Sequence, residues 1–252
     1  MAKVYFVGAG PGAPDLITIR GRSLLDSADV VIYAGSLVNP ALLDGIKAEV
    51  HDSAGMDLDE TTEATRKAVA EGKDVVRLHT GDLSFYSAIT EQIHRLRPLG
   101  IEYEVVPGVS SLAAGSAALE TELTLPEVTQ TVIVTRRAGR TPVPESESLR
   151  LLAAHGSTMV IFLSVGMMEQ VVDDLIQGGY GESTPVAVVE KASWPGEQIV
   201  RGTLSDISSK VEKAGIKKTA LIYVGAAAGS SETRPGAESK LYDRDFKHGY
   251  RK

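Results

Sequence analysis

The sequence predicts an α/β protein with two domains, the first built on a mainly parallel sheet and the second on a mixed sheet. In the first half, short apolar runs alternate with helical patterns, which is typical of parallel β-α-β units. In the second half, several strand-like runs are joined by short connections, which favours antiparallel pairs. Between the halves, residues 120–129 are polar and lack periodicity, and this predicts a linker.

The first domain is expected over residues 1–119. Its predicted strands cover 4–7, 29–34, 75–78 and 103–106. Thr18 can cap a first helix, and Asp59 begins a second that ends at Gly72. Two more helices are predicted over 87–97, where Pro98 ends the pattern, and over 111–119, which is rich in alanine.

The second domain is expected over residues 130–229, followed by a polar tail over 230–252. Its predicted strands cover 131–135, 159–163, 186–189, 199–200 and 220–224. Helical patterns cover 149–154, 168–176 and a segment through Ile207 and Val211.

Composition narrows the class of protein. The chain has 252 residues, a net charge of −7, a pI of about 5.3 and no cysteine, which excludes disulfides and thiolate chemistry. The low pI argues against a nucleic-acid partner. No signal-peptide pattern and no apolar run of 18 residues is present, so we expect a cytoplasmic protein without a membrane partner.

The first apolar run continues into a loop with three glycines and two prolines, residues 8–14. Gly8, Gly10 and Ala13 match the dinucleotide fingerprint. We reject that interpretation because Pro11 and Pro14 interrupt the helix start that a pyrophosphate needs. A tight turn without a ligand remains the alternative.

Three strand ends carry candidate binding groups: residues 8–14, 80–82 and 107–111. Parallel strands bring their carboxyl ends to one sheet edge, where open α/β sheets bind ligands. The resulting groove would offer backbone groups and one carboxylate, Asp82, which suits a polar ligand of low charge. Asp82 is alternatively a cap for the following helix, and no P-loop motif is present.

Few other side chains suggest chemistry. The five histidines lack metal-ligand spacing, so no metal site is predicted, although His79 adjoins the turn at 80–82. Ser36, Ser110 and Ser111 lack the context of a hydrolase nucleophile. Trp194, the single tryptophan, is either a flat wall for a planar ligand or ordinary packing.

A basic cluster follows the first strand of the second half. It consists of Arg136, Arg137 and Arg140. Guanidinium groups can hold carboxylates through paired hydrogen bonds. A solvated basic loop is the alternative.

Several ordered motifs give a resemblance to a known family. They are V-Y-F-V-G-A-G-P-G-A-P-D-L-I-T, R-L-H-T-G-D-L-S-F-Y, V-V-P-G-V-S-S-L-A-A, M-V-I-F-L-S-V, P-V-A-V-V-E-K-A-S-W-P-G-E and T-A-L-I-Y-V-G. Together they resemble the tetrapyrrole methylase family, up to about Gly229. The segments 30–39, 162–168 and 240–251 resemble the branch that methylates C11 of precorrin-4 or cobalt-precorrin-4 in cobalamin synthesis.

This resemblance implies an S-adenosylmethionine-dependent methyltransferase, a homodimer with a ligand cleft between its two α/β domains. The resemblance also implies which residues contact the methyl donor. They are Pro11, Gly81, Asp82, Phe85, Ser110, Ser111, Leu163, Ala192 and Ala220. The family's G-D-P is Gly81-Asp82-Leu83 here, and Ser87 stands where a glycine is usual, so the shape of that loop is open.

The implied reaction needs orientation more than a catalytic triad, because the substrate carbon is itself the nucleophile. Asp82 and Glu190 are the candidate stabiliser and base, and Arg136, Arg137, Arg140 and Trp194 the candidate substrate contacts. Alternatives are a family member acting on another corrin carbon, on ribosomal RNA or on a modified histidine, and a non-enzymatic dinucleotide-binding module.

Overall fold

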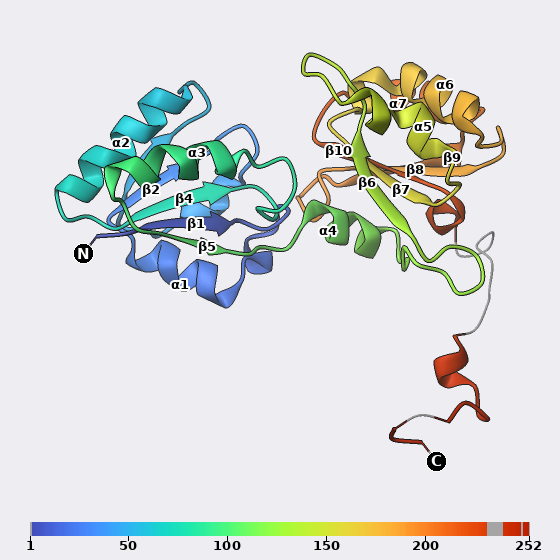
Figure 1. Cartoon of the computed structure of the whole chain (residues 1–252), viewed down its shortest axis with the longest axis horizontal. Coiled ribbons are helices and arrows are strands. Elements are labelled where there is room, and N and C mark those ends of the chain that lie inside the picture. The colour runs from blue at the N-terminus through green and yellow to red at the C-terminus, as the bar shows by residue number, and fades with distance from the viewer. Residues whose placement is uncertain (1, 231–238, 248, 252) are drawn as a thin grey trace. The chain divides into compact units, whose positions relative to one another are not determined.

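A computed structural model gives the positions of residues 2–230, 239–247 and 249–251 (Figure 1). The chain divides into two compact units. Unit 1 contains residues 1–114 and 191–196, and unit 2 contains residues 115–190 and 197–252. A short segment from the second half of the chain, 191–196, therefore belongs to the first unit.

Unit 1 is built on a five-stranded sheet in the order β3-β2-β4-β1-β5, with every neighbouring pair parallel. The strands are β1 (Val4–Gly8), β2 (Val30–Tyr33), β3 (Glu49–Asp52), β4 (Val75–His79) and β5 (Tyr103–Val106). The predicted parallel sheet is confirmed. Because β1 has β4 and β5 as neighbours, the turns after these three strands lie at the same edge.

Helices cover both faces of this sheet (Figure 1). They are α1 (Ile19–Ser27) on one face and α2 (Leu58–Ala70) and α3 (Ile89–Leu96) on the other. Alternate strand residues pack into the two cores: Val4 and Phe6 face the side of α2 and α3, whereas Val7 packs with Leu25 of α1.

The edge strand β3 was not predicted from the sequence. Its four residues, Glu-Val-His-Asp, are exposed or half-buried, so no apolar run marks them.

The start of α2 also differs from the expected Asp59. Asp57 accepts from the N–H of Glu60, and the Glu60 carboxylate accepts from the N–H of Asp57, which forms a capping box two residues earlier.

Unit 2 contains the predicted mixed sheet, in the order β6-β7-β10-β8-β9. Its β6 and β7 are parallel and the other neighbours are antiparallel. The strands are β6 (Val132–Arg136), β7 (Thr158–Phe162), β8 (Pro185–Glu190), β9 (Gln198–Thr203) and β10 (Ala220–Val224). β9 is longer than the predicted 199–200 because half-exposed residues extend it.

Three helices cover one face of the mixed sheet (Figure 1). They are α5 (Leu149–Ala153), α6 (Met168–Gly178) and α7 (Ile207–Ala214), whose apolar side chains share a core with Met159, Ile161 and Ile222. The helix α4 (Ser111–Ala118) carries Gly115, where a Cβ atom would come within 2.1 Å of the Tyr223 hydroxyl. Glycine thus permits close packing of α4 on β10.

Part of the polar tail lies outside the described residues, namely 231–238, 248 and 252. The described part contains a short 3-10 helix, Lys240–Tyr242, in which the Ser239 hydroxyl accepts from the N–H of Leu241. No helix among the described residues is long and apolar enough to span a membrane.

Candidate functional site

Three glycines bring the strand ends of unit 1 together. A Cβ atom on Gly108 would lie 2.3 Å from the carbonyl oxygen of Gly81 and 2.8 Å from the Cα atom of Gly8. Gly10 and Gly81 also exchange two backbone hydrogen bonds of 3.2 and 2.8 Å. The predicted meeting of the turns after β1, β4 and β5 is therefore present, and glycine is what permits it.

Asp82 lies inside this cluster of turns. Its carboxylate accepts hydrogen bonds from the N–H groups of Gly108 at 2.9 Å and Ser84 at 2.8 Å. Burial opposes ionisation, but the hydrogen bonds from Ser84, Gly108 and Leu83 outweigh it and lower the pKa of Asp82. The result is a part-buried, ionised carboxylate at the sheet edge. Its bond to Ser84 closes a turn, because α3 begins only at Ile89.

The neighbouring predicted donor contacts of unit 1 are close in space. The hydroxyl of Ser110 accepts from the N–H of Leu112 at the start of α4, and the backbone of Ser111 lies against Gly81. Phe85, in the turn after Asp82, is 39% exposed. Through Gly81, which pairs with Gly10, Ser111 is linked to the glycine-rich loop.

The segment 191–196 lies against the glycine-rich loop. The indole N–H of Trp194 donates to the carbonyl of Pro11 at 2.8 Å, and the hydroxyl of Ser193 accepts from the N–H of Ala13 at 3.0 Å. Ala192 is buried beside them. Pro11 of the first motif and Ala192 and Trp194 of a later one, all predicted as ligand contacts, thus belong to the same unit.

In unit 2 the predicted residues gather at one edge of the mixed sheet. Glu190 ends β8 and pairs with Ala220, which begins β10. Arg136 ends β6 opposite Phe162, and Leu163 directly follows Phe162. Ile161 pairs with Ile222 in antiparallel register, so the end of β7 and the start of β10 share this edge.

Backbone strain accumulates at these positions. Of eight non-glycine residues with positive φ among the described residues, five coincide with or adjoin a predicted donor contact. These five are Tyr86, Leu163, Lys191, Ser193 and Thr219. Each costs roughly 1 kcal/mol or more, and such strain is concentrated at functional sites. Sequence patterns did not reveal it.

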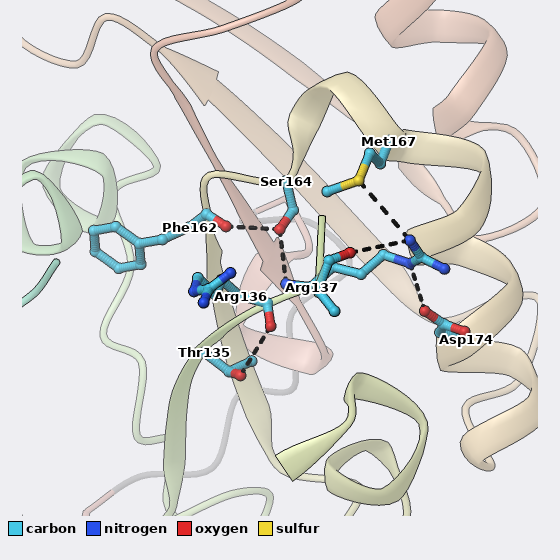
Figure 2. Close-up of polar contacts among 8 residues, drawn as sticks. Thr135, Arg136, Arg137, Phe162, Ser164, Met167 and Asp174 are labelled. Atoms are coloured by element: carbon cyan, nitrogen blue, oxygen red, sulfur yellow. Dashed lines mark hydrogen bonds and ion pairs between the residues drawn. The ribbon is translucent and has the colours of Figure 1, made fainter. Parts of the chain in front are cut away.

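The three arginines differ in their surroundings, and Figure 2 shows two of them, Arg136 and Arg137. Arg137 forms a 2.6 Å ion pair with Asp174 of α6 and is also close to the sulfur of Met167. Arg136 donates to the carbonyl oxygens of Thr141 at 3.2 Å and Pro142 at 2.6 Å. Both therefore hold the loop that carries Arg140, which is exposed.

His79 is buried at the end of β4, and its Nε2 atom has no hydrogen-bond partner among the described residues. Burial, aided by the nearby charge of Arg77, lowers the pKa of His79 to about 3. The imidazole is therefore neutral and packs near Phe6, at 6.1 Å between ring centroids. Among the described residues, no cluster of three or more acidic or histidine side chains could hold a metal ion.

Sequence reasoning missed two residues that shape the glycine-rich loop. Ser193 binds Ala13, and the buried side-chain amide of Asn39 donates to the carbonyl of Gly12 at 2.8 Å. Both lie in segments already compared with the family, but no local pattern relates them to a loop that is distant in sequence.

Comparison with known proteins indicates the same family as the sequence motifs do. The family model of tetrapyrrole (corrin/porphyrin) methylases matches residues 3–208. A relative from Methanocaldococcus jannaschii named cobalt-precorrin-4 C(11)-methyltransferase is 60% identical over 252 residues, covering 99% of this chain and 96% of the relative.

Two solved structures extend this comparison. The X-ray structure of a cobalt precorrin-4 methyltransferase has a TM-score of 0.88 and 50% identity, covering 90% of this chain and 96% of the other. A uroporphyrin-III C-methyl transferase from Thermus thermophilus, complexed with S-adenyl homocysteine, has a TM-score of 0.78 and 28% identity, covering 93% and 98%.

Proposed function

Because this chain belongs to the tetrapyrrole (corrin/porphyrin) methylase family, we propose that it is an S-adenosylmethionine-dependent methyltransferase acting on C11 of cobalt-precorrin-4 or precorrin-4. The observation that carries the proposal is the 60% identity, across nearly the whole of both chains, to a relative named for this reaction on the cobalt substrate. A second, independent support is the strained backbone at or beside the residues that the resemblance implies as contacts of the methyl donor.

The residues proposed to hold the donor fit its charge. They are Pro11, Gly81, Asp82, Phe85, Ser110, Ser111 and Ala192 from unit 1, with Leu163 and Ala220 from unit 2. None carries a cation, and the one charged side chain is the Asp82 carboxylate, whose pKa is lowered. A binding surface of backbone groups with a single anion suits a positively charged sulfonium compound.

When bound, S-adenosylmethionine supplies an electrophilic methyl group, which the ring carbon takes with its own electron pair while the electrons of the S–C bond stay on sulfur. The protein's part is orientation and charge. Fixed strand-end turns hold the reacting groups in line, an effect worth roughly 7–11 kcal/mol at most. Asp82 stabilises the positive charge that develops on the macrocycle. Glu190, half-buried at the end of β8, is the proposed acceptor of the ring proton.

The substrate carries carboxylates, and we assign their recognition to the loop after β6. Arg140 is the exposed cation of that loop, held out by the contacts of Arg136 and Arg137. Replacing Arg140 by alanine should raise KM for the tetrapyrrole several-fold and leave donor binding unchanged. Arg150→Ala, which removes an exposed cation from α5, is the matched control.

The direct test is methyl transfer from labelled S-adenosylmethionine to cobalt-precorrin-4 and to precorrin-4, with the labelled carbon located by NMR. Label at C11 is the expected result. Transfer to another ring carbon would replace the proposed reaction, and binding of NADH in place of S-adenosylhomocysteine would remove the methyltransferase assignment altogether. The Asp82→Asn variant, which removes the negative charge and one of the two oxygens that accept from Ser84 and Gly108, should lose kcat by one to two orders of magnitude.

A cytoplasmic homodimer is the proposed working form, as the family resemblance implies. Sedimentation equilibrium of the full chain tests the oligomeric state, with a mass of twice 26.7 kDa expected. A monomer at micromolar concentration would contradict it.

A further inference from the structure

The glycine-rich loop uses almost all of its own polar groups within the protein. Gly10 is paired with Gly81, and the carbonyls of Pro11, Gly12 and Ala13 accept from Trp194, Asn39 and Leu16. The N–H of Ala13 donates to Ser193. Proline at positions 11 and 14 leaves no N–H to satisfy there.

One donor in this loop is the exception. The N–H of Gly12 donates to no atom among the described residues, although Gly12 is buried. Buried N–H groups are nearly always paired, because an unmade hydrogen bond costs roughly 1–3 kcal/mol. An unpaired donor at a strand-end turn therefore points to an acceptor on a bound molecule.

Trp194 fixes the direction of this donor. The carbonyl of Pro11 and the N–H of Gly12 belong to the same peptide unit, which is planar and trans. The two groups point in opposite directions, so the 2.8 Å bond from the indole to the carbonyl also sets where the N–H points. The indole packs so closely on Gly12 that a Cβ atom there would lie 2.0 Å from Cδ1.

We propose that the N–H of Gly12 donates a hydrogen bond to an acceptor atom of the bound methyl donor, and that Trp194 is the positioning residue that aims it. This inference rests on the proposed function. Trp194 acts through the Pro11–Gly12 peptide, rather than as a wall for the tetrapyrrole.

The turn that presents Trp194 is itself strained, which fits a positioning role. Lys191 and Ser193 have φ of 50° and 68°, and the N–H of Trp194 donates to the carbonyl of Lys191 at 2.9 Å. This tight turn lets Ser193 and Trp194 bind the loop at two points, Ala13 and Pro11. The peptide between Pro11 and Gly12 is thereby held against rotation.

The sequence allows the single amide to be observed. Only four glycines follow a proline, at positions 12, 108, 196 and 236. Full-length protein labelled with carbonyl-13C proline and 15N glycine therefore gives four signals in a two-dimensional HNCO spectrum, and Pro11→Ala identifies the one from Gly12. S-adenosylhomocysteine should move the Gly12 proton downfield, and the other three signals are compared with it in the same spectrum.

The positioning role of Trp194 is tested by removing its N–H alone. Because the chain has one tryptophan, global replacement with benzothienylalanine, which has sulfur in place of N–H, changes only this position. Affinity for S-adenosylhomocysteine, measured by calorimetry, should fall about three- to tenfold. The ligand-induced shift of Gly12 should shrink, with the other signals unchanged. Trp194→Phe is the second variant and should behave alike.

The possible outcomes separate the two proposals. If S-adenosylhomocysteine binds but the Gly12 signal does not move, the inference is wrong and the proposed function stands. If it moves equally in the benzothienyl protein, Gly12 is a donor and Trp194 is not its positioning residue. If calorimetry detects no binding in the unmodified chain, the proposed function fails first.

Discussion

At the sheet edges that carry the predicted site, the two units differ in which residues adopt a left-handed backbone conformation. In unit 1, the left-handed conformations after β1 and β4 belong to glycines, Gly10 with φ of 79° and Gly81 with φ of 65°. In unit 2, comparable values of 55° and 54° occur at Leu163 and Thr219, which carry Cβ atoms. The turns directly after β1 and β4 are therefore relaxed, whereas Leu163 and Thr219 store strain; the strain of unit 1 lies elsewhere, as at Tyr86, Lys191 and Ser193.

The difference follows from the space that each sheet edge leaves for a side chain. The turns of unit 1 pack backbone against backbone, and at Gly8 and Gly108 a side chain has no room. Leu163 has room, since its side chain is 68% exposed, and glycine would relieve the strain there.

The largest expected effect comes from adding a side chain to the closely packed strand-end turns of unit 1. Gly108→Ala would place a Cβ atom against two other backbones and should lower the free energy of unfolding by about 3 kcal/mol or more. Gly55→Ala is the control, because nothing lies within 4 Å of its added atom and its φ is not positive. Urea denaturation compares the two, and equal midpoints would contradict the crowding argument.

Acidification should also distinguish the units. His79 of unit 1 is the only buried histidine among the described residues, and burial lowers its pKa to about 3, against 6.5 in the unfolded chain. Between these values the unfolded state binds the extra proton, so stability falls as pH falls, by up to about 1.4 kcal/mol per unit.

The expected result is that the amide protection factors of unit 1, each taken relative to the intrinsic exchange rate at that pH, fall before those of unit 2 between pH 6 and 4.5. His79→Phe keeps an aromatic ring near Phe6, removes the titrating group and should flatten this dependence. His155→Gln, which changes an exposed histidine, should leave it intact. An unchanged pH profile in His79→Phe would assign the acid sensitivity to other groups.

The smallest expected effect on stability is at the strained edge. Leu163→Gly should raise the free energy of unfolding by up to about 1 kcal/mol, because little burial is lost and the strain is relieved. It should weaken S-adenosylhomocysteine binding at the same time. Glu127→Gly relieves similar strain at an exposed position away from the predicted contacts, and should stabilise without affecting binding.

Most of the fold could be predicted because apolar runs follow burial closely in β1, β2, β4, β7, β8 and β10. The exception, β3, is an edge strand whose side chains are mostly exposed, so its pairing with β2 leaves no pattern in the sequence. The start of α2 differs from the predicted one because reciprocal hydrogen bonds between Asp57 and Glu60 determine where the helix begins.

Less of the site's geometry could be predicted. Strand-end turns identified Asp82, whose carboxylate then proved to bind Gly108, twenty-six residues away. The partners of Pro11 and Ala13 come from residues 193 and 194, and no local pattern encodes such contacts. The ion pair of Arg137 with Asp174 spans 37 residues, so sequence could not distinguish a structural arginine from an exposed one.

The assignment of residues 191–196 to unit 1 has a consequence for how the protein is made. The ribosome releases the N-terminal segment of that unit long before it synthesises the residues that bind Pro11 and Ala13. At roughly 5–20 residues per second, the nascent parallel sheet waits on the order of several seconds for its last piece. The glycine-rich loop is therefore completed only after most of the chain has left the exit tunnel, so an incomplete translation product lacks its two tethers.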